Sequence, residues 1–562
     1  MIKSINFNTR IHLNILPENF RLSCLRTPKF SILKKFNTLI SISALICVLL
    51  AGGCEKFLDK PIEGQVSSWD VDYSDLTQMY MPVAGVYANC RSVLLIQWSD
   101  NCVDQFRSDH IVHGSSIIHW YMTNELERYE YDNNNFYTFQ AWDRPYRIIN
   151  RCETALAELD KFRGNATGAD LTKNDQYKAE VRFFRALAYW RVARYFGDIC
   201  YFDKNIASID LRLSPRAEAY DWIINEIKDF RDDLPDGHPN TLDNAGAVTR
   251  WAADMLLAKA AADVQDYTTM QEAAGDIVNS GLFSLHPDYS EMLSINGELC
   301  DENIFELQYY YYSADGTYTN IGSYYSCLGI RASITAKVPV LGNYSMEDGW
   351  GFALPSQTFI DLFISRGETV RYTRTIIAPE SVTPKGDSVG GLDNNTISAI
   401  DLYTAENLPN GVAPLHIFKT FMESEDRTAV NNSEHGIYGG YNNIRVFRYA
   451  DALLLYAEAL VHNNGAGAGD AYINEVRARA GMTPLTGATI DHILDERAVE
   501  LAMEWGGDRF YDLVRLGRTR FLGANFTAGE DEFLLTPQPQ IDNHPGLTED
   551  PVSGLFPTTF GD

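Results

Sequence analysis

Apolar side chains recur every three or four positions along much of the chain, which predicts amphipathic helices. Between residues 69 and 290 the predicted helices span 69–90, 138–160, 174–196, 214–234, 247–263 and 269–280. The last three are joined by short loops, so neighbours run antiparallel, and alanine is frequent at their expected contact positions. Helix pairs of this kind cannot bury their apolar faces alone, which predicts stacked tetratricopeptide-like hairpins.

The helical pattern stops near residue 291 and returns near residue 446. Alternating apolar residues predict a strand at 304–312, and only 355–364 has a helical pattern in the rest of this stretch. Further helices are predicted at 448–462, 470–480 and 489–505. We therefore expect a mainly α fold, in which an irregular part (291–445) lies between helical parts at 69–290 and 446–562. Long irregular segments in compact proteins are usually functional.

The amino-terminal end has the three parts of a secretory signal. Lys34 and Lys35 precede an apolar stretch at 39–50, which ends in small residues before Cys54. The junction resembles the lipobox of bacterial lipoproteins, although Ala51 stands where leucine is usual. We expect a signal peptide at 1–53, acylation of Cys54 and an extended tether at 54–68. The alternative is a cleaved signal with an unmodified Cys54.

Charge restricts the possible partners. The chain has 75 acidic and 47 basic side chains, a net charge of −28, and removal of residues 1–53 makes it −34. A surface so acidic repels nucleic-acid phosphates and anionic lipid. Nucleic-acid binding is thereby excluded.

Six cysteines follow Cys54, and none belongs to a CxxC pair. They are Cys90, Cys102, Cys152, Cys200, Cys300 and Cys327. Their spacings match no zinc or redox motif. They are also too sparse for a disulfide framework, so we expect small buried side chains, with one disulfide also compatible.

Two patterns superficially resemble ligand-binding motifs. His110, His113 and His119 follow Asp109, but the glycine and serines at 114–116 favour a polar surface loop over a metal site. The glycine-rich run 465–469 follows no predicted strand, so we interpret it as an interhelical loop instead of a phosphate cradle. The sequence contains neither GxSxG nor a Walker motif. We expect no metal and no catalytic residue.

Charged side chains are dense between residues 496 and 515. Glu500 and Glu504 are four positions apart on a predicted helix, with Arg509 and Arg515 close by. A pair of carboxylates could serve a hydrolase if a cleft separated them by about 5–10 Å. Charges at helical spacing more often pair with each other. We interpret this cluster as an ion-pair network that holds the last helices together.

Several segments, in order, resemble the SusD/RagB family of outer-membrane nutrient-binding lipoproteins. They are CEKFLDKP at 54–61, WxxxYxxIN at 142–150, 179–198, 246–258, ENIFELQY at 302–309, RYADALLLYAEA at 448–459, ERAVELAMEWGGDRFYDLVR at 496–515, and the segment from Leu534. The resemblance extends from about residue 54 to 551. Ordered agreement over that length is more specific than any single motif.

The resemblance implies a helical platform of four tetratricopeptide-like units and an irregular half that faces ligand. It also implies a cell-surface protein, anchored to the outer membrane by lipid, that partners a SusC-like TonB-dependent transporter and captures oligosaccharides, or peptides in some branches. No cofactor is required, although backbone and aspartate oxygens could hold a surface calcium ion.

Aromatic residues in the non-helical segments are the candidate ligand contacts. Their faces stack on the C–H side of sugar rings, and adjacent amides bind hydroxyl groups. The candidates are Trp98, Asn101, Trp120, Tyr312, Tyr318, Tyr324 and Trp350. Each could instead pack within its loop. We expect an oligosaccharide-binding protein; peptide capture, glycoside hydrolysis and a non-binding scaffold are the alternatives.

Overall fold

The computed structural model describes residues 71–91, 98–113, 121–200, 211–292, 294–309, 353–377, 416–417 and 443–547. The chain divides into two compact units, Met1–Asp72 and Tyr73–Asp562, and every element below belongs to the second. The expected signal peptide, Cys54 and the tether lie outside the described residues.

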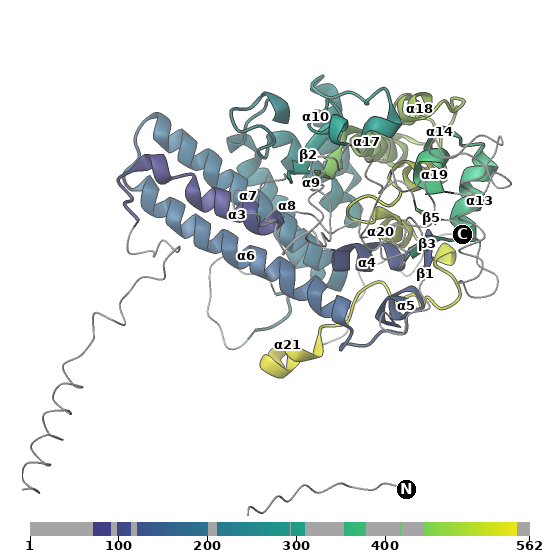
Figure 1. Ribbon diagram of the computed structural model, residues 1–562, viewed down its shortest axis with the longest axis horizontal. Coiled ribbons are helices and arrows are strands. Elements are labelled where there is room, and N and C mark those ends of the chain that lie inside the picture. Colours follow the sequence, from purple (N-terminus) through teal and green to yellow (C-terminus); the bar gives the residue numbers. More distant parts are fainter. Residues whose placement is uncertain are drawn as a thin grey trace, which may run out of the picture. The chain divides into compact units, whose positions relative to one another are not determined.

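The first helices form hairpins. Their bounds are α3 (Met81–Asn89), α4 (Trp98–Phe106), α5 (Tyr121–Glu127), α6 (Phe136–Arg163), α7 (Ala169–Phe196), α8 (Arg216–Phe230), α9 (Arg250–Asp263) and α10 (Tyr267–Asn279). The long helices α6 and α7 pack along each other, and α3 lies against both (Figure 1). Helix α8 packs on α7 and α9, and α9 packs on α10. The predicted hairpins are confirmed in this part of the fold.

Helices of the second half extend the same packing. They are α11 (Tyr289–Met292), α13 (Gln357–Arg366), α14 (Val370–Thr375), α17 (Tyr449–Asn464), α18 (Asp470–Arg479), α19 (Ile490–Glu500), α20 (Asp508–Arg515) and α21 (Gln538–Asn543). Helix α17 packs against α10 as well as α18 and α19. The glycine-rich run at 465–469 joins α17 to α18, which confirms an interhelical loop. The mainly α fold class is therefore confirmed.

Short antiparallel strand pairs join segments far apart in sequence. The pairs are β1 (Ile111–His113) with β3 (Ala353–Pro355), β2 (Asn303–Leu307) with β6 (Ile444–Arg448), and β4 (Ile376–Ile377) with β5 (His416–Ile417). Strand β2 overlaps the predicted strand at 304–312 at residues 304–307, but all five residues of β2 are buried. The alternation of apolar and polar residues therefore does not correspond to one buried face and one solvent-exposed face of the strand.

Side-chain caps fix where several helices begin. The Asn135 side chain accepts a hydrogen bond from the Tyr137 amide at α6, and the Ser356 hydroxyl does so from the Phe359 amide at α13. Thr249 accepts from the Ala252 amide at α9. Such caps satisfy amides that have no partner within the first turn.

Three local expectations are wrong. Residues 98–106 form α4 and not an irregular segment, α14 is a second helix within 291–445, and the helix predicted at 489–505 ends at Glu500. The apolar pattern of the sequence does not indicate helix α4, because its buried face includes acidic side chains. Asp100 pairs with Arg144, and Asp104 with Arg191, so a polar sequence can be buried.

The described cysteines pack as expected. Cys90, Cys102, Cys152 and Cys200 are buried free thiols, and Cys300 is a half-buried one. Cys327 lies outside the described residues. Within the described part, no helix combines the length and apolarity that a membrane span needs.

Candidate functional site

Most of the candidate ligand contacts lie beyond the described residues. These are Trp120, Tyr312, Tyr318, Tyr324 and Trp350. Trp98 begins α4, and only its backbone is described. Asn101 lies within α4, where its side chain is fully buried and presents no surface to a ligand.

The described elements next to the three candidate tryptophans contact one another. Trp98 begins α4, Trp120 directly precedes α5, and Trp350 is three residues before β3. Strand β1 pairs with β3, His113 opposite Ala353, and both α4 and α5 pack against β1. We call α4, α5, β1 and β3 the tryptophan-flanked cluster. Elements of residues 98–127 and the distant strand β3 thus form one cluster.

Polar contacts fix this cluster to the carboxyl-terminal helices. The Arg509 guanidinium of α20 donates two hydrogen bonds of 2.8 Å to the Asp109 carboxylate. The Ser356 amide donates to the His110 carbonyl at 2.8 Å. The His110 ring stacks on Phe359, with 4.1 Å between ring centroids. His110 is 2% exposed, so the expected polar surface loop is wrong here. Such packing holds the cluster rigid.

The histidines of this region do not converge on a common point. His113 Nδ1 lies 2.9 Å from the Thr123 hydroxyl, while the His110 ring packs on Phe359. His119 lies outside the described residues. No group of three or more histidine, cysteine, aspartate or glutamate side chains in the described ranges could hold a metal ion.

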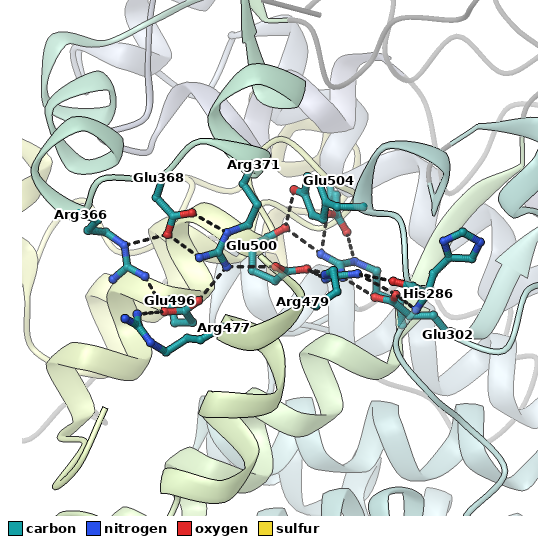
Figure 2. Close-up of polar contacts among 12 residues, drawn as sticks. His286, Glu302, Arg366, Glu368, Arg371, Arg477, Arg479, Glu496, Glu500 and Glu504 are labelled. Carbon is teal, nitrogen blue, oxygen red and sulfur yellow. Dashed lines mark hydrogen bonds and ion pairs between the residues drawn. The ribbon is translucent and has the colours of Figure 1, made fainter. Parts of the chain in front are cut away.

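A buried network of arginines and glutamates joins the helices of the second half, as Figure 2 shows. Its arginines come from α13, α14, β6 and α18. Two of its glutamates belong to α19, one directly precedes β2, one lies between α13 and α14, and one follows α19. The members are Arg366, Arg371, Arg448, Arg477, Arg479, Glu302, Glu368, Glu496, Glu500 and Glu504. The ten members are five arginines and five glutamates, so their formal charges sum to zero. Arg366 is the most exposed member, at 14% of its side chain.

Arg448 lies at the centre of this network. Its five N–H groups donate to the Glu302 carboxylate, the Glu504 carboxylate (twice), the Glu500 carboxylate and the Glu500 carbonyl, at 2.7–2.8 Å. Burial alone would lower the pKa of Arg448, but the adjacent carboxylates raise it well above its usual value. Both Glu500 and Glu504 bind this arginine. Arg497 of α19 pairs with Asp512 of α20 at 2.7 Å, which confirms the predicted ion pair between the last helices. Glu500 and Glu504, however, pair with Arg448 of β6 and not with Arg509 or Arg515.

A separate buried carboxylate has an unusual pKa. Glu180 of α7 is 1% exposed and accepts hydrogen bonds from the Tyr87 hydroxyl (2.8 Å) and the Gln176 amide (3.2 Å). Burial raises its pKa to about 7, although the hydrogen bonds from Tyr87 and Gln176 and the positive charge of Lys173 lower it in part. Because the ionised form is disfavoured in the folded protein, this residue destabilises the fold as the pH rises from about 4.5 to 7.

We expect Glu180→Gln to become more stable relative to the wild type as the pH rises from 5 to 8. The change should be on the order of 3 kcal/mol, since each pKa unit corresponds to about 1.4 kcal/mol. Urea unfolding of both proteins across this range measures it.

The control is Glu226→Gln. Burial alone would raise the pKa of Glu226, but Arg182 and Arg185 lower it. The ionised Glu226 carboxylate stabilises the fold, and this stabilisation is lost only below about pH 4.5. The difference in free energy of unfolding between Glu226→Gln and the wild type should therefore stay constant from pH 5 to 8. An equally constant difference for Glu180→Gln would contradict the raised pKa.

The structure is similar to a SusD superfamily protein from Bacteroides vulgatus (TM-score 0.66, 19% identity, 85% of this chain and 99% of that one). It is also similar to surface glycan-binding protein A from Bacteroides thetaiotaomicron in complex with laminarihexaose (TM-score 0.66, 21% identity, 83% and 97%).

The sequence agrees with this fold. Residues 301–538 match the family described as the SusD family, and residues 56–261 match the one described as "Starch-binding associating with outer membrane". The chain is 26% identical to SusD-like protein P2 of Formosa agariphila, over 75% of this chain and 82% of that protein. It is 27% identical to starch-binding protein SusD of Bacteroides thetaiotaomicron, over 64% and 68%. The chain belongs to the SusD/RagB family.

Proposed function

We propose that this protein is a surface-exposed outer-membrane lipoprotein that captures oligosaccharides and delivers them to a TonB-dependent transporter. The observation that carries this proposal is the contact among α4, α5, β1 and β3, the elements next to Trp98, Trp120 and Trp350 in the sequence. Aromatic faces are the side chains best suited to stack on sugar rings. Two of the similar proteins, starch-binding protein SusD and surface glycan-binding protein A, are named for binding starch or glycan.

The surroundings of the cluster favour capture over hydrolysis. Glu500 and Glu504, the carboxylate pair with the most suggestive spacing, are both buried and bound by Arg448. Carboxylates held this way cannot exchange protons with a substrate. The ion pairs instead make the platform rigid, which reduces the entropy lost when a ligand binds. Glycoside hydrolysis is thus the weaker alternative.

Binding is tested by calorimetric titration of the full chain, purified in detergent, against neutral glycans, anionic glycans and peptides. We expect saturable binding to one glycan class. Trp98→Ala and Trp350→Ala should each weaken it about tenfold or more, because a lost stacking contact is worth about 1.4 kcal/mol. Trp251→Ala is the matched control, since Trp251 is half-buried on α9, away from the cluster.

Each other outcome identifies an alternative. Binding of peptides alone would place the protein in the peptide-capturing branch. Release of reducing sugar from a bound glycan would establish a hydrolase. Failure to bind any ligand, together with tight association with the transporter, would indicate a scaffold. Glycan affinity unchanged by both tryptophan substitutions would move the site away from the tryptophan-flanked cluster.

A further inference from the structure

One face of α3 lines a cavity on a different part of the fold. Tyr80, Ala84, Tyr87 and Arg91 recur at spacings of four, three and four, so they share one side of the helix. All four line a cavity of about 200 Å³. Ala84 is small and exposed, and it leaves a hollow between the two tyrosines. We call this space the α3 cavity.

Two other segments complete the α3 cavity. They are the turn at 244–247, which precedes α9, and residues 306–308 at the end of β2. Gly246 lies in the turn with a φ of +80°, a conformation that glycine adopts readily. A Cβ atom there would come within 1.7 Å of Gln308 Nε2. Glycine therefore lets the turn approach β2 closely enough to close this side.

Hydrogen bonds hold the three walls together. The Tyr87 hydroxyl accepts from the Val248 amide at 2.8 Å, which joins α3 to the turn. Gln308 Nε2 donates to the Ala245 carbonyl at 2.7 Å, which joins β2 to the turn. Arg91 Nη1 donates to the Gln308 carbonyl at 3.4 Å, which joins α3 to β2. Each pair of walls is thus linked directly, so the cavity is already formed without a ligand.

Packing also fixes the tyrosine rings. The Tyr80 ring lies 5.1 Å from the Tyr177 ring, and the Tyr87 ring contacts Phe184 edge-on at 4.7 Å. Both partners belong to α7, the long helix on which α3 packs. Rings held in place in this way lose little entropy when they contact a ligand.

The size and lining of the α3 cavity define what it can hold. Water occupies roughly 30 Å³ per molecule, so 200 Å³ corresponds to about seven waters, or to one ring the size of a sugar. Its walls combine two aromatic rings with hydroxyl, amide and guanidinium groups, which suits a ring bearing several hydroxyls. We propose that the α3 cavity binds a single sugar unit, as a site separate from the tryptophan-flanked cluster.

The two sites belong to different elements. The α3 cavity is formed by α3, the turn before α9 and the end of β2, whereas the tryptophan-flanked cluster consists of α4, α5, β1 and β3. Figure 1 shows α3 along α6 and α7, with β1 and β3 near α5. The choice of a sugar as ligand rests on the proposed function, while the cavity itself does not.

The test uses ligand-observed saturation-transfer NMR on the full chain in detergent. The probes are glucose, galactose, mannose, N-acetylglucosamine and glucuronate. We expect at least one to bind, and its signal to fall at least fivefold in Ala84→Trp, which fills the cavity from an exposed position. Met81→Trp is the matched control, since Met81 is 58% exposed on the same helix and does not line the cavity.

Trp350→Ala separates this proposal from the proposed function. A monosaccharide signal that survives Trp350→Ala and is lost in Ala84→Trp supports the α3 cavity. A signal lost in Trp350→Ala and retained in Ala84→Trp, or binding of oligosaccharides without any monosaccharide, overturns the α3 cavity and leaves the proposed function standing. Failure of every saccharide to bind overturns both.

Discussion

Arg448→Met is expected to lower the free energy of unfolding by about 3–5 kcal/mol, because it leaves Glu302, Glu500 and Glu504 buried without their shared cation. Arg448 is 2% exposed, and its five donors are all used. Methionine is close in length but supplies no donor. Urea unfolding followed by circular dichroism gives the free energy.

A surface pair provides the matched control for this substitution. Arg128 Nη2 lies 2.9 Å from Glu130 Oε1, and about half of each side chain is exposed. Arg128→Met should therefore cost no more than about 1 kcal/mol. In the double variant Arg448→Met/Glu504→Gln, part of the lost stability should return, since one uncompensated charge is removed. A loss below 1 kcal/mol for Arg448→Met would contradict this prediction. It would show that water or rearranged side chains satisfy the carboxylates in place of the arginine.

Local periodicity was enough to predict most helices. Helix α7 (Ala169–Phe196) was expected at 174–196, and α17 (Tyr449–Asn464) at 448–462, because each has a wide apolar stripe. Helix α4 was missed because its buried face includes Asp100 and Asp104, which hydropathy counts as exposed. Its burial depends on Arg144 and Arg191, which are 44 and 87 residues away. No local pattern contains that information.

The sites depend even more on distant contacts. The tryptophans were recognisable as candidates, but the contact of β3 with the other elements that flank them follows from its pairing with β1, about 240 residues away. His110 seemed exposed in sequence because its partners, Phe359 and Ser356, lie in another part of the chain. The α3 cavity was missed although Tyr80, Ala84, Tyr87 and Arg91 have helical spacing. The buried apolar residues of α3 are Val83 and Val86, which the cavity does not involve, and the two other walls come from later segments.

The buried network explains how the distant segments of the fold stay in place. Arg371 of α14 binds Glu368 beside it and both Glu496 and Glu500 of α19. Arg448, through Glu302, then connects α19 to strand β2. The end of β2 forms a wall of the α3 cavity. In the sequence, α13 links β3 of the tryptophan-flanked cluster to α14. One network therefore supports elements of both proposed sites.

Cys54→Ser is expected to abolish fatty-acid labelling of the protein and to release it from the membrane fraction. If Cys54 is acylated as proposed, its fatty-acid chains provide the membrane anchor. Each buried methylene contributes roughly 0.8 kcal/mol, so one sixteen-carbon chain contributes roughly 12 kcal/mol. Growth with an alkyne-tagged fatty acid, followed by fractionation, measures both effects.

The alternative for Cys54 makes a distinct prediction. If a signal peptide is removed and the thiol stays unmodified, the wild type carries no fatty acid and Cys54→Ser changes neither labelling nor fractionation. Cys300→Ser is the matched control, because Cys300 is a half-buried free thiol within the folded unit. Its labelling and membrane association should equal those of the wild type. Loss of label in both variants would instead indicate acylation that is not specific to Cys54, and would contradict the proposed anchor.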